Sequence, residues 1–392
     1  MDINAESLKL HEQLHGKIEV ISRRHVETAE DLSLVYTPGV AEPCRRIQKD
    51  PDLSFQLTRR SNLVAVITDG SAVLGLGNIG GVAGMPVMEG KCALFKEFAG
   101  VDAFPLCVAT QDVDELVDTI ARIADSFGGI NLEDISAPRC FEVERKLKER
   151  CSIPVFHDDQ HGTAIVVSAA MLNAVKLTGK TMGKLKIVIN GAGAAGCAIA
   201  RLLLKIGFGE VLLCDSRGIV CEGDPKLTAE KEKLSHITNL SHVKGTLADA
   251  MRGADVVIGV SKPGVITQDM VRSMHEGMVF ALANPVPEIM PQEALEAGAV
   301  VVGTGRSDFP NQINNVLIFP GIFKGALSVR AKQITENMKE AAAYAIASII
   351  PEKDLRADYI LPSALDKRVA EVVAKAAAEA AIKDGVARIG HC

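Results

Sequence analysis

The sequence has no tryptophan and only three tyrosines among its 392 residues, and it lacks an apolar run of the roughly 20 residues that a bilayer-spanning helix needs. The first residues are polar and acidic, whereas a signal peptide begins with a basic region followed by an apolar one. We therefore expect a cytoplasmic protein that makes no membrane contact. Because tyrosine is so scarce, Tyr36, which stands in a turn with proline and glycine, is a candidate for a special role.

An excess of positive charge is also missing. Lysine and arginine number 43 against 49 acidic residues, for a formal net charge of −6. Without a basic stripe to follow a phosphate backbone, nucleic acid is not an expected partner. The nine cysteines are scattered without a CxxC motif, which is typical of reduced, packed thiols rather than of a disulfide framework.

Short apolar runs alternate with helical patterns in the second half of the chain. Hydrophobic residues make up 47% of the sequence, which excludes a disordered chain, and 392 residues are enough for two or three domains. The apolar runs cover residues 186–190, 211–215, 255–260, 278–285 and 299–305. Continuous apolar runs bounded by turns predict parallel strands that are buried on both faces. We therefore predict an α/β fold with a doubly wound, Rossmann-type domain.

The first part of the chain predicts a second, N-terminal α/β domain. Its helical patterns cover residues 5–30, 112–127 and 139–150, with an apolar strand at 63–69 and a glycine-rich loop at 70–84. Further helices are expected at 162–177, 331–350 and 363–383, the last with a capping-box-like Ser363 and Asp366. We predict a substrate and metal domain (1–160), a dinucleotide domain (161–320) and C-terminal helices (321–392), whose packing on the first domain is left open.

A glycine-rich turn follows the first predicted strand of the second domain. Its residues are Gly191, Gly193, Ala194, Ala195 and Gly196. Glycines at this spacing allow a tight turn, close approach of a pyrophosphate and packing of helix on strand. Asp215 ends the next strand, where a carboxylate can accept a hydrogen bond from a ribose 2′-hydroxyl and repel a 2′-phosphate. This pattern predicts NAD, with NADP as the alternative because Arg217 could neutralise a 2′-phosphate. The competing interpretation is a tight turn without a ligand.

Two acidic pairs, Glu133-Asp134 and Asp158-Asp159, each follow an apolar run. Carboxylates that converge at strand ends repel one another unless a cation joins them, and oxygen ligands suit Mg²⁺ or Mn²⁺. Each pair taken singly could instead be an acidic helix N-terminus. His157 and His161 lie four residues apart, but without the glutamate of a zinc-protease motif. We interpret both histidines as packed or capping residues.

Taken together, several motifs resemble those of malic enzymes of the short, bacterial type over nearly the whole chain. They are VYTPGVAEPC (35–44), VITDGSAVLGLGNIGG (66–81), MEGKCALFKEFAGVDA (88–103), NLEDI (131–135), VFHDDQHGTA (155–164), GAGAAG (191–196), ANPVPE (283–288) and RSDFPNQINNVLIFPG (306–321). The resemblance implies oxidative decarboxylation of L-malate to pyruvate with a nicotinamide cofactor and a divalent metal, and a homodimer. Decarboxylation of oxaloacetate is a further implied activity.

The same resemblance implies a role for each site residue. Glu133, Asp134 and Asp159 are similar to the metal ligands, with Asp158 as a neighbouring, proton-handling carboxylate. Lys91 is similar to the general base and Tyr36 to the general acid. Asn284 and Asn315 are similar to residues that hold substrate, and Asn284 also borders the cofactor. Because an amine acts as a base near neutral pH only when its pKa is lowered, we expect a cation and partial burial to lower the pKa of Lys91.

Three alternatives stay open at this stage. The first is a malolactic-type enzyme, which would use the same site but release lactate. The second is a metal-independent two-domain dehydrogenase, and the third is a catalytically silent nucleotide-binding module. Longer family members carry an arginine in the TDG loop that pairs with a malate carboxylate, whereas this loop contains Ser71 and Ala72. The sequence also leaves open whether Tyr36 serves its own subunit or a neighbour.

Overall fold

Two separate sheets organise the chain in a computed structural model that describes residues 2–73 and 75–390. The first sheet has the strand order β2-β1-β3-β4, with every strand parallel. Its strands are β1 (Leu63–Thr68), β2 (Asp102–Cys107), β3 (Gly129–Leu132) and β4 (Val155–His157). Helices α5 (Gly81–Ala99), α6 (Val113–Ile123) and α7 (Arg139–Arg150) connect these strands. The polar residues that follow β3 and β4 therefore meet at one edge of the sheet.

The second sheet has the order β10-β9-β8-β5-β6-β7, in which only β7 runs antiparallel. Its strands are β5 (Lys186–Asn190), β6 (Glu210–Asp215), β7 (Gly218–Ile219), β8 (Val256–Gly259), β9 (Met278–Ala281) and β10 (Val301–Thr304). The strand order reverses between β5 and β8, the place where open α/β sheets bind ligands. The predicted doubly wound α/β fold is confirmed.

Short helices complete the second domain and the connections. They are α9 (Ala194–Ile206), α10 (Ala229–Ser235), α11 (Leu247–Met251), α12 (Gln268–Arg272) and α13 (Pro291–Glu296). Single 3-10 turns cover Pro51–Leu53, Arg59–Asn62, Ala124–Ser126, Met182–Lys184, Asn315–Leu317 and Glu352–Asp354. Over residues 2–73 and 75–390, we find no helix with both the length and the apolar composition needed to cross a bilayer.

The long helix α8 (Asp158–Thr178) leads from the first sheet to the second. It begins directly after β4, four residues before the start expected from the sequence at Gly162. Asp158 and Asp159 therefore occupy its first turn, where negative charge complements the helix dipole. Apart from Asp159, His161 and Thr163, the residues of α8 from Asp158 to Val175 are buried, so this helix is the core that both domains share.

The C-terminal helices pack back on the first domain. Helix α14 (Phe319–Ser328) contacts α5, and the rings of Phe95 and Phe319 lie 4.8 Å apart. Helix α15 (Glu336–Ala347) lies on α8. The helix expected over 331–350 begins only at Glu336, because Thr335 caps it. The helix expected over 363–383 is α16 (Arg368–Lys383), and Ser363 and Asp366 form a turn before it instead of a capping box.

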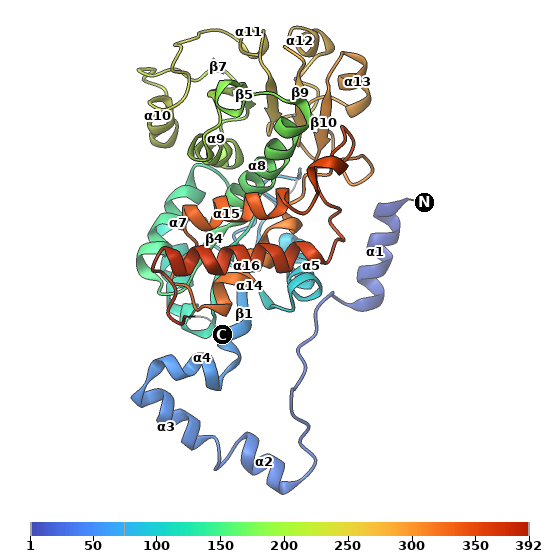
Figure 1. The fold of residues 1–392 in the computed structure, drawn as a ribbon. Coiled ribbons are helices and arrows are strands. Elements are labelled where there is room, and N and C mark those ends of the chain that lie inside the picture. The colour runs from blue at the N-terminus through green and yellow to red at the C-terminus, as the bar shows by residue number, and fades with distance from the viewer. Residues whose placement is uncertain (1, 74, 391–392) are drawn as a thin grey trace.

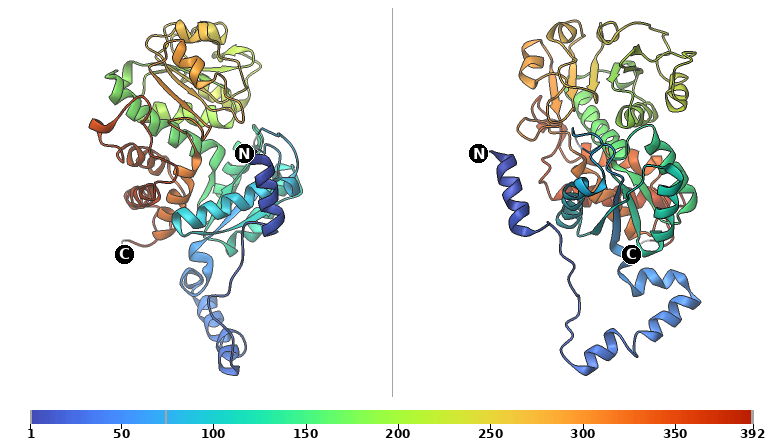
Figure 2. Two further views of the ribbon diagram at one scale, coloured as in Figure 1. Left: turned by 90° about the vertical axis from the view of Figure 1, so that its right-hand side faces the viewer. Right: turned by 180° about the vertical axis from the view of Figure 1, so that it is seen from behind.

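The N-terminal residues 2–50, here called the arm, contact α5 at Lys17, whose N–H donates to Glu89 at 2.9 Å. The arm then extends away from the body of the molecule and returns at α4 (Ser54–Leu57), as Figures 1 and 2 show. The arm consists of α1 (Ile3–Leu14), α2 (Ala29–Val35) and α3 (Ala41–Lys49), which have no buried residue. The helical pattern over 5–30 is interrupted at His15 and Gly16, both with positive φ. The arm therefore has no core of its own within this chain.

Candidate active site

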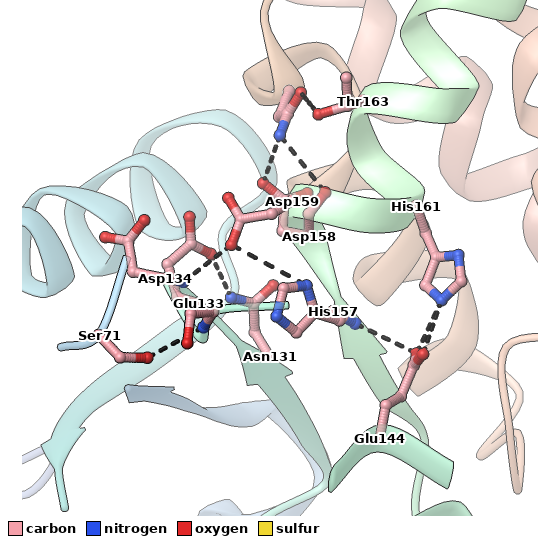
Figure 3. Close-up of polar contacts among 12 residues, drawn as sticks. Ser71, Asn131, Glu133, Asp134, Glu144, His157, Asp158, Asp159, His161 and Thr163 are labelled. Carbon is pink, nitrogen blue, oxygen red and sulfur yellow. Dashed lines mark hydrogen bonds and ion pairs between the residues drawn. The ribbon is translucent and has the colours of Figure 1, made fainter. Parts of the chain in front are cut away.

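Four carboxylates gather where β3 and β4 end. Glu133 and Asp134 follow β3, and Asp158 and Asp159 follow β4, as Figure 3 shows. Ligand oxygens of Glu133, Asp134 and Asp159 lie within 4.8 Å of one another. The backbone N–H of Asp134 donates to Asp159 Oδ2 at 2.8 Å, which holds the two strand ends together. Three converging carboxylates in a largely buried place fit a hard divalent cation such as Mg²⁺ or Mn²⁺.

Lys91 lies beside this cluster. Its Nζ is 2.5 Å from Asp158 Oδ2 and 2.9 Å from Glu133 Oε1, and its side chain is 10% exposed. The ammonium also lies over the ring of Phe319, 4.0 Å from the centroid. Helix α5 therefore presents a single buried amine between two carboxylates from different strands.

The pKa of Lys91 depends on the balance between its burial and the charges around it. Burial by itself lowers the pKa of Lys91, but the charges of Asp158 and Glu133 raise it above its usual value. Burial and neighbouring carboxylates raise the pKa of both Glu133 and Asp159. The lowered pKa expected for Lys91 is thus not produced by the protein groups alone. It requires a positive charge that offsets the carboxylates.

Asn315, in the 3-10 turn Asn315–Leu317, connects to the same carboxylates. Its Nδ2 donates to Asp158 Oδ2 at 3.0 Å, and its Oδ1 accepts from Thr163 Oγ1 at 3.1 Å. Asn284 lies where the two domains approach each other. A Cβ on Gly75 would lie 2.9 Å from the carbonyl oxygen of Asn284, so only glycine allows this loop to come so close. Both asparagines are therefore at or near the contact between the domains.

Tyr36 is not brought to this cluster by its own chain. It directly follows α2 on the arm and is 68% exposed. Figure 1 shows α2 well away from α5, which carries Lys91, and Figure 2 agrees from two other sides. The structure thus brings together Lys91, Asn315 and the four carboxylates, and leaves Tyr36 on the arm.

The glycine-rich turn lies at the reversal point of the second sheet. A Cβ on Gly196 would lie 1.8 Å from the carbonyl oxygen of Gly191, so helix α9 can start this close to the strand only with glycine. A Cβ on Gly193 would meet nothing within 4 Å, which leaves its backbone open to a ligand. Gly191 and Gly193, with Asp215 and Lys231, line a cavity of about 590 Å³.

Asp215 is held by two cations. It accepts from Lys231 Nζ at 2.7 Å, and Arg217 lies 3.4 Å away through its guanidinium. Ion pairing and hydrogen bonds outweigh burial and lower the pKa of Asp215. Lys231 comes from α10 and was not identified in the sequence, because the turns that bring α10 back to β6 have no recognisable motif.

The TDG loop contains a second ion pair that the sequence did not predict. Asp69 Oδ2 lies 2.9 Å from the guanidinium of Arg139, which also donates to Ser136 and to the carbonyl of Gln111. Arg139 is the first residue of α7. Since its guanidinium is occupied by these partners, it stabilises the loop rather than standing ready for a substrate carboxylate.

The two histidines do not form a zinc site with each other. His157 is fully buried, and burial lowers its pKa. The Nε2 of His161 is 2.8 Å from Glu144, and its Nδ1 is 2.9 Å from Lys339 Nζ. Burial lowers the pKa of His161 to about 4. Glu144 and Lys339 were not identified in the sequence, since they lie on other helices, 17 and 178 residues from His161 along the chain.

A dinucleotide-binding sheet joined to a carboxylate-lined domain defines an oxidoreductase that uses a nicotinamide cofactor. The family model of the malic enzyme N-terminal domain matches residues 15–148, and that of the malic enzyme NAD-binding domain matches residues 160–383. The chain belongs to the malic enzyme family.

Individual relatives agree with this assignment. The bifunctional malic/malolactic enzyme of Bacillus subtilis is 56% identical, over 99% of this chain and 95% of its own length. An NADP-dependent malic enzyme of Halomonas elongata is 49% identical, over 95% of this chain and 92% of its own. The crystal structure of the NAD-dependent malic enzyme of Thermotoga maritima has a TM-score of 0.92 and 47% identity, and covers 95% of this chain and 98% of its own.

Proposed function

We propose that this chain oxidises L-malate with NAD or NADP and decarboxylates the product to pyruvate and CO₂, with dependence on Mg²⁺ or Mn²⁺. Decarboxylation of added oxaloacetate is part of the proposal. The observation that carries it is the position of Lys91 between Glu133 and Asp158, at the edge of the carboxylate cluster. Residues 1–160 would form the substrate and metal domain, and residues 161–320 the cofactor domain, which also contributes Asn284 and Asn315 to the substrate site. The helices of 321–392 would brace the first domain.

Glu133, Asp134 and Asp159 would hold the divalent cation. When bound, it would supply Lewis acidity toward the hydroxyl and carboxylate oxygens of malate and would stabilise the enolate left by loss of CO₂. Its charge would also offset the carboxylates that raise the pKa of Lys91, and so favour the neutral amine that a general base needs.

Lys91 is the proposed base for the C2 hydroxyl of malate. With a bound nicotinamide cofactor as the hydride acceptor, the amine of Lys91 would take the proton of the C2 hydroxyl as C2 is oxidised. Asp158 contacts that amine and is itself held by Asn315, so it is suited to receive or return the proton. Loss of CO₂ would then leave an enolate whose C3 takes a proton from Tyr36, the proposed acid. Tyr36 would regain that proton from Lys91, which took it from the C2 hydroxyl, so both residues return to their starting states.

Because Tyr36 lies on the exposed arm, its proposed role implies a second subunit. Half of the large exposed hydrophobic side chains in the described residues lie between Ile3 and Val40. An apolar segment without a core of its own is typical of an interface. We place the arm of one subunit against another in a homodimer, with Tyr36 entering the neighbour's site.

Asn284 and Asn315 are the proposed substrate-holding residues, and Asn284 also borders the cofactor. The turn from Gly191 to Gly196, with Ala194 and Ala195, would hold the pyrophosphate at the start of α9. Asp215 would accept a hydrogen bond from the ribose 2′-hydroxyl of NAD. A cytoplasmic location belongs to the same proposal, and it is supported by free thiols at the eight cysteines that the structure describes.

A steady-state assay tests the proposal. Malate with Mn²⁺ and either NAD or NADP should give reduced cofactor, seen at 340 nm, together with pyruvate. A flat trace with lactate formed would favour the malolactic alternative, which gains weight because the Bacillus subtilis relative is described as bifunctional. Full activity in excess chelator would instead favour a metal-independent dehydrogenase.

A further inference from the structure

A network of polar side chains, buried except for its end at Glu336, whose side chain is 58% exposed, lies behind the carboxylate cluster and is not used by any step above. It runs from Glu336 and Lys339 on α15 through His161 on α8 to Glu144 on α7. The distances along it are 2.6 Å from Glu336 Oε1 to Lys339 Nζ, 2.9 Å from that Nζ to His161 Nδ1, and 2.8 Å from His161 Nε2 to Glu144 Oε1. Lys339 is 2% exposed and Glu144 is 6% exposed. This polar network therefore links three helices, α15, α8 and α7, through the interior.

The chemistry of its members fixes the hydrogen atoms. The Glu144 carboxylate, which also pairs with Lys148, has only acceptors, so His161 Nε2 must carry the hydrogen and donate to it. Nδ1 of the neutral ring then has no hydrogen and accepts from Lys339 Nζ. His161 is thereby held as a single neutral tautomer, with both ring nitrogens used. Lys148 closes the far end, 2.8 Å from Glu144 Oε1.

The polar network holds the segment of α8 that carries two of the site carboxylates, Asp158 and Asp159. His161 lies two residues after Asp159 on α8, and Glu144 Oε1 also accepts the backbone N–H of His157 at 3.4 Å, just before Asp158. Figure 3 shows Glu144 below His161, joined to it and to the His157 backbone by dashed lines. Glu144 therefore binds the chain on both sides of the Asp158-Asp159 pair.

We propose that Lys339 and Glu144 are positioning residues for the divalent-metal site, and that they act through His161. The proposal rests on the metal-dependent function proposed above. Replacing a buried ion pair by apolar residues is often neutral for stability, so stability alone does not account for this arrangement. What the polar network does provide is a fixed direction for the first turn of α8, which places Asp159 toward Glu133 and Asp134.

Direct binding of Mn²⁺, followed by the EPR signal of the free ion, tests the proposal without catalysis. Lys339→Met keeps most of the buried stem but leaves His161 Nδ1 without a donor. Its dissociation constant for Mn²⁺ should rise about tenfold, the lower end of what loss of outer support does at metal sites. NAD binding should stay unchanged. The matched control is Lys180→Met, which removes a 10%-exposed lysine that pairs at 2.8 Å with Asp255, directly before the central strand β8 of the second sheet. It should bind Mn²⁺ like the wild type.

A pair of substitutions at His161 separates positioning from packing. Glutamine offers one acceptor and one N–H donor, so His161→Gln can still accept from Lys339 and donate to Glu144. His161→Leu fills the space without either bond. We expect His161→Gln to retain near wild-type Mn²⁺ affinity and His161→Leu to lose about tenfold. If Lys339→Met does not fold, as judged by far-ultraviolet circular dichroism, this pair carries the test.

The outcomes separate the two proposals. Wild-type protein that binds Mn²⁺ while Lys339→Met and His161→Leu bind it equally well would overturn the positioning role and leave the proposed function standing. Equal weakening in Lys180→Met would also overturn it, because the effect would then be general. Wild-type protein that binds no Mn²⁺ would instead refute the metal-dependent function itself.

Discussion

Two carboxylates, Glu133 and Asp158, hold the Lys91 amine in the interior of the first domain. Their charges raise its pKa, so among protein groups alone the amine stays protonated. A general base must be neutral, and the proposed mechanism therefore couples the base to the occupancy of the carboxylate cluster. Metal removal should consequently abolish proton abstraction as well as enolate stabilisation.

Lys91→Ala removes the proposed base and should lower kcat for malate oxidation by about 10³-fold, within the usual range for loss of a general base. NAD binding should be nearly intact, because the dinucleotide turn lies in the other domain. Steady-state kinetics and cofactor titration measure the two effects. Lys96→Ala on the same helix α5 removes a 58%-exposed lysine and is the control. Wild-type turnover in Lys91→Ala would remove Lys91 from the mechanism.

Asp215 and Lys231 form a pair whose separate removal should move cofactor choice in opposite directions. Asp215→Ala leaves the cations of Lys231 and Arg217 facing the ribose, so kcat/KM for NADP relative to NAD should rise about tenfold, which corresponds to about 1.4 kcal/mol. Lys231→Met should lower the same ratio, since one cation is lost. The ratio is measured with both cofactors at saturating malate and Mn²⁺. An unchanged ratio in both variants would show that neither residue contacts the ribose.

Local motifs predicted the residues of the site better than they predicted their partners. Glu133 and Asp158 were identified because each follows an apolar run, and Lys91 because of a family motif. Lys339 was missed, because its only signal is its place on α15, 178 residues from His161 along the chain. A hydrogen bond between helices so distant in sequence leaves no local pattern.

At the scale of elements, apolar runs bounded by turns predicted the second sheet closely. Runs of this kind carry their own signal, since both faces of a parallel strand are buried. Helix ends were less accurate. The start of α8 at Asp158 depends on how β4 ends against β3, and the break of the arm at His15 and Gly16 depends on a left-handed turn that periodicity does not show.

The ends of β3 and β4 should make stability depend on pH and on metal together. Burial is the main cause that raises the pKa of Glu133 to about 8 and that of Asp159 to about 7. Because both values exceed those of the unfolded chain, the native state binds more protons, and the stability that these groups contribute is lost as pH rises through about 7 to 8. A divalent cation takes the place of those protons.

The increase in Tm on adding saturating Mn²⁺ should therefore grow between about pH 6 and pH 8. Thermal scans by circular dichroism, in chelator and in Mn²⁺ at each pH, measure it. Glu133→Gln removes one titrating group and one ligand, and should reduce the increase at every pH. An increase that stays constant with pH would contradict the assignment of these carboxylates as ligands.

At the scale of the whole molecule, the arm is the part that has no buried core within a single subunit. Its helices bury no residue, while α8, α14 and α15 form a continuous interior with both domains. Tyr36 was identified in the sequence from its motif, but the sequence did not indicate which subunit the arm packs against. In the proposed homodimer, Tyr36 of one subunit and Lys91 of the other belong to the same site.

Mixing two inactive variants tests this shared site. Tyr36→Phe and Lys91→Ala should each be nearly inactive alone. When the two are unfolded together and refolded, half of the dimers should contain one subunit of each kind, and one of their two sites would then combine an intact Tyr36 with an intact Lys91. About one quarter of wild-type activity should return, because random pairing in a two-fold dimer gives that fraction of intact sites. Each variant refolded alone is the control. If Tyr36 served its own subunit, every site in the mixture would lack one of the two groups, and no activity would return at any mixing ratio.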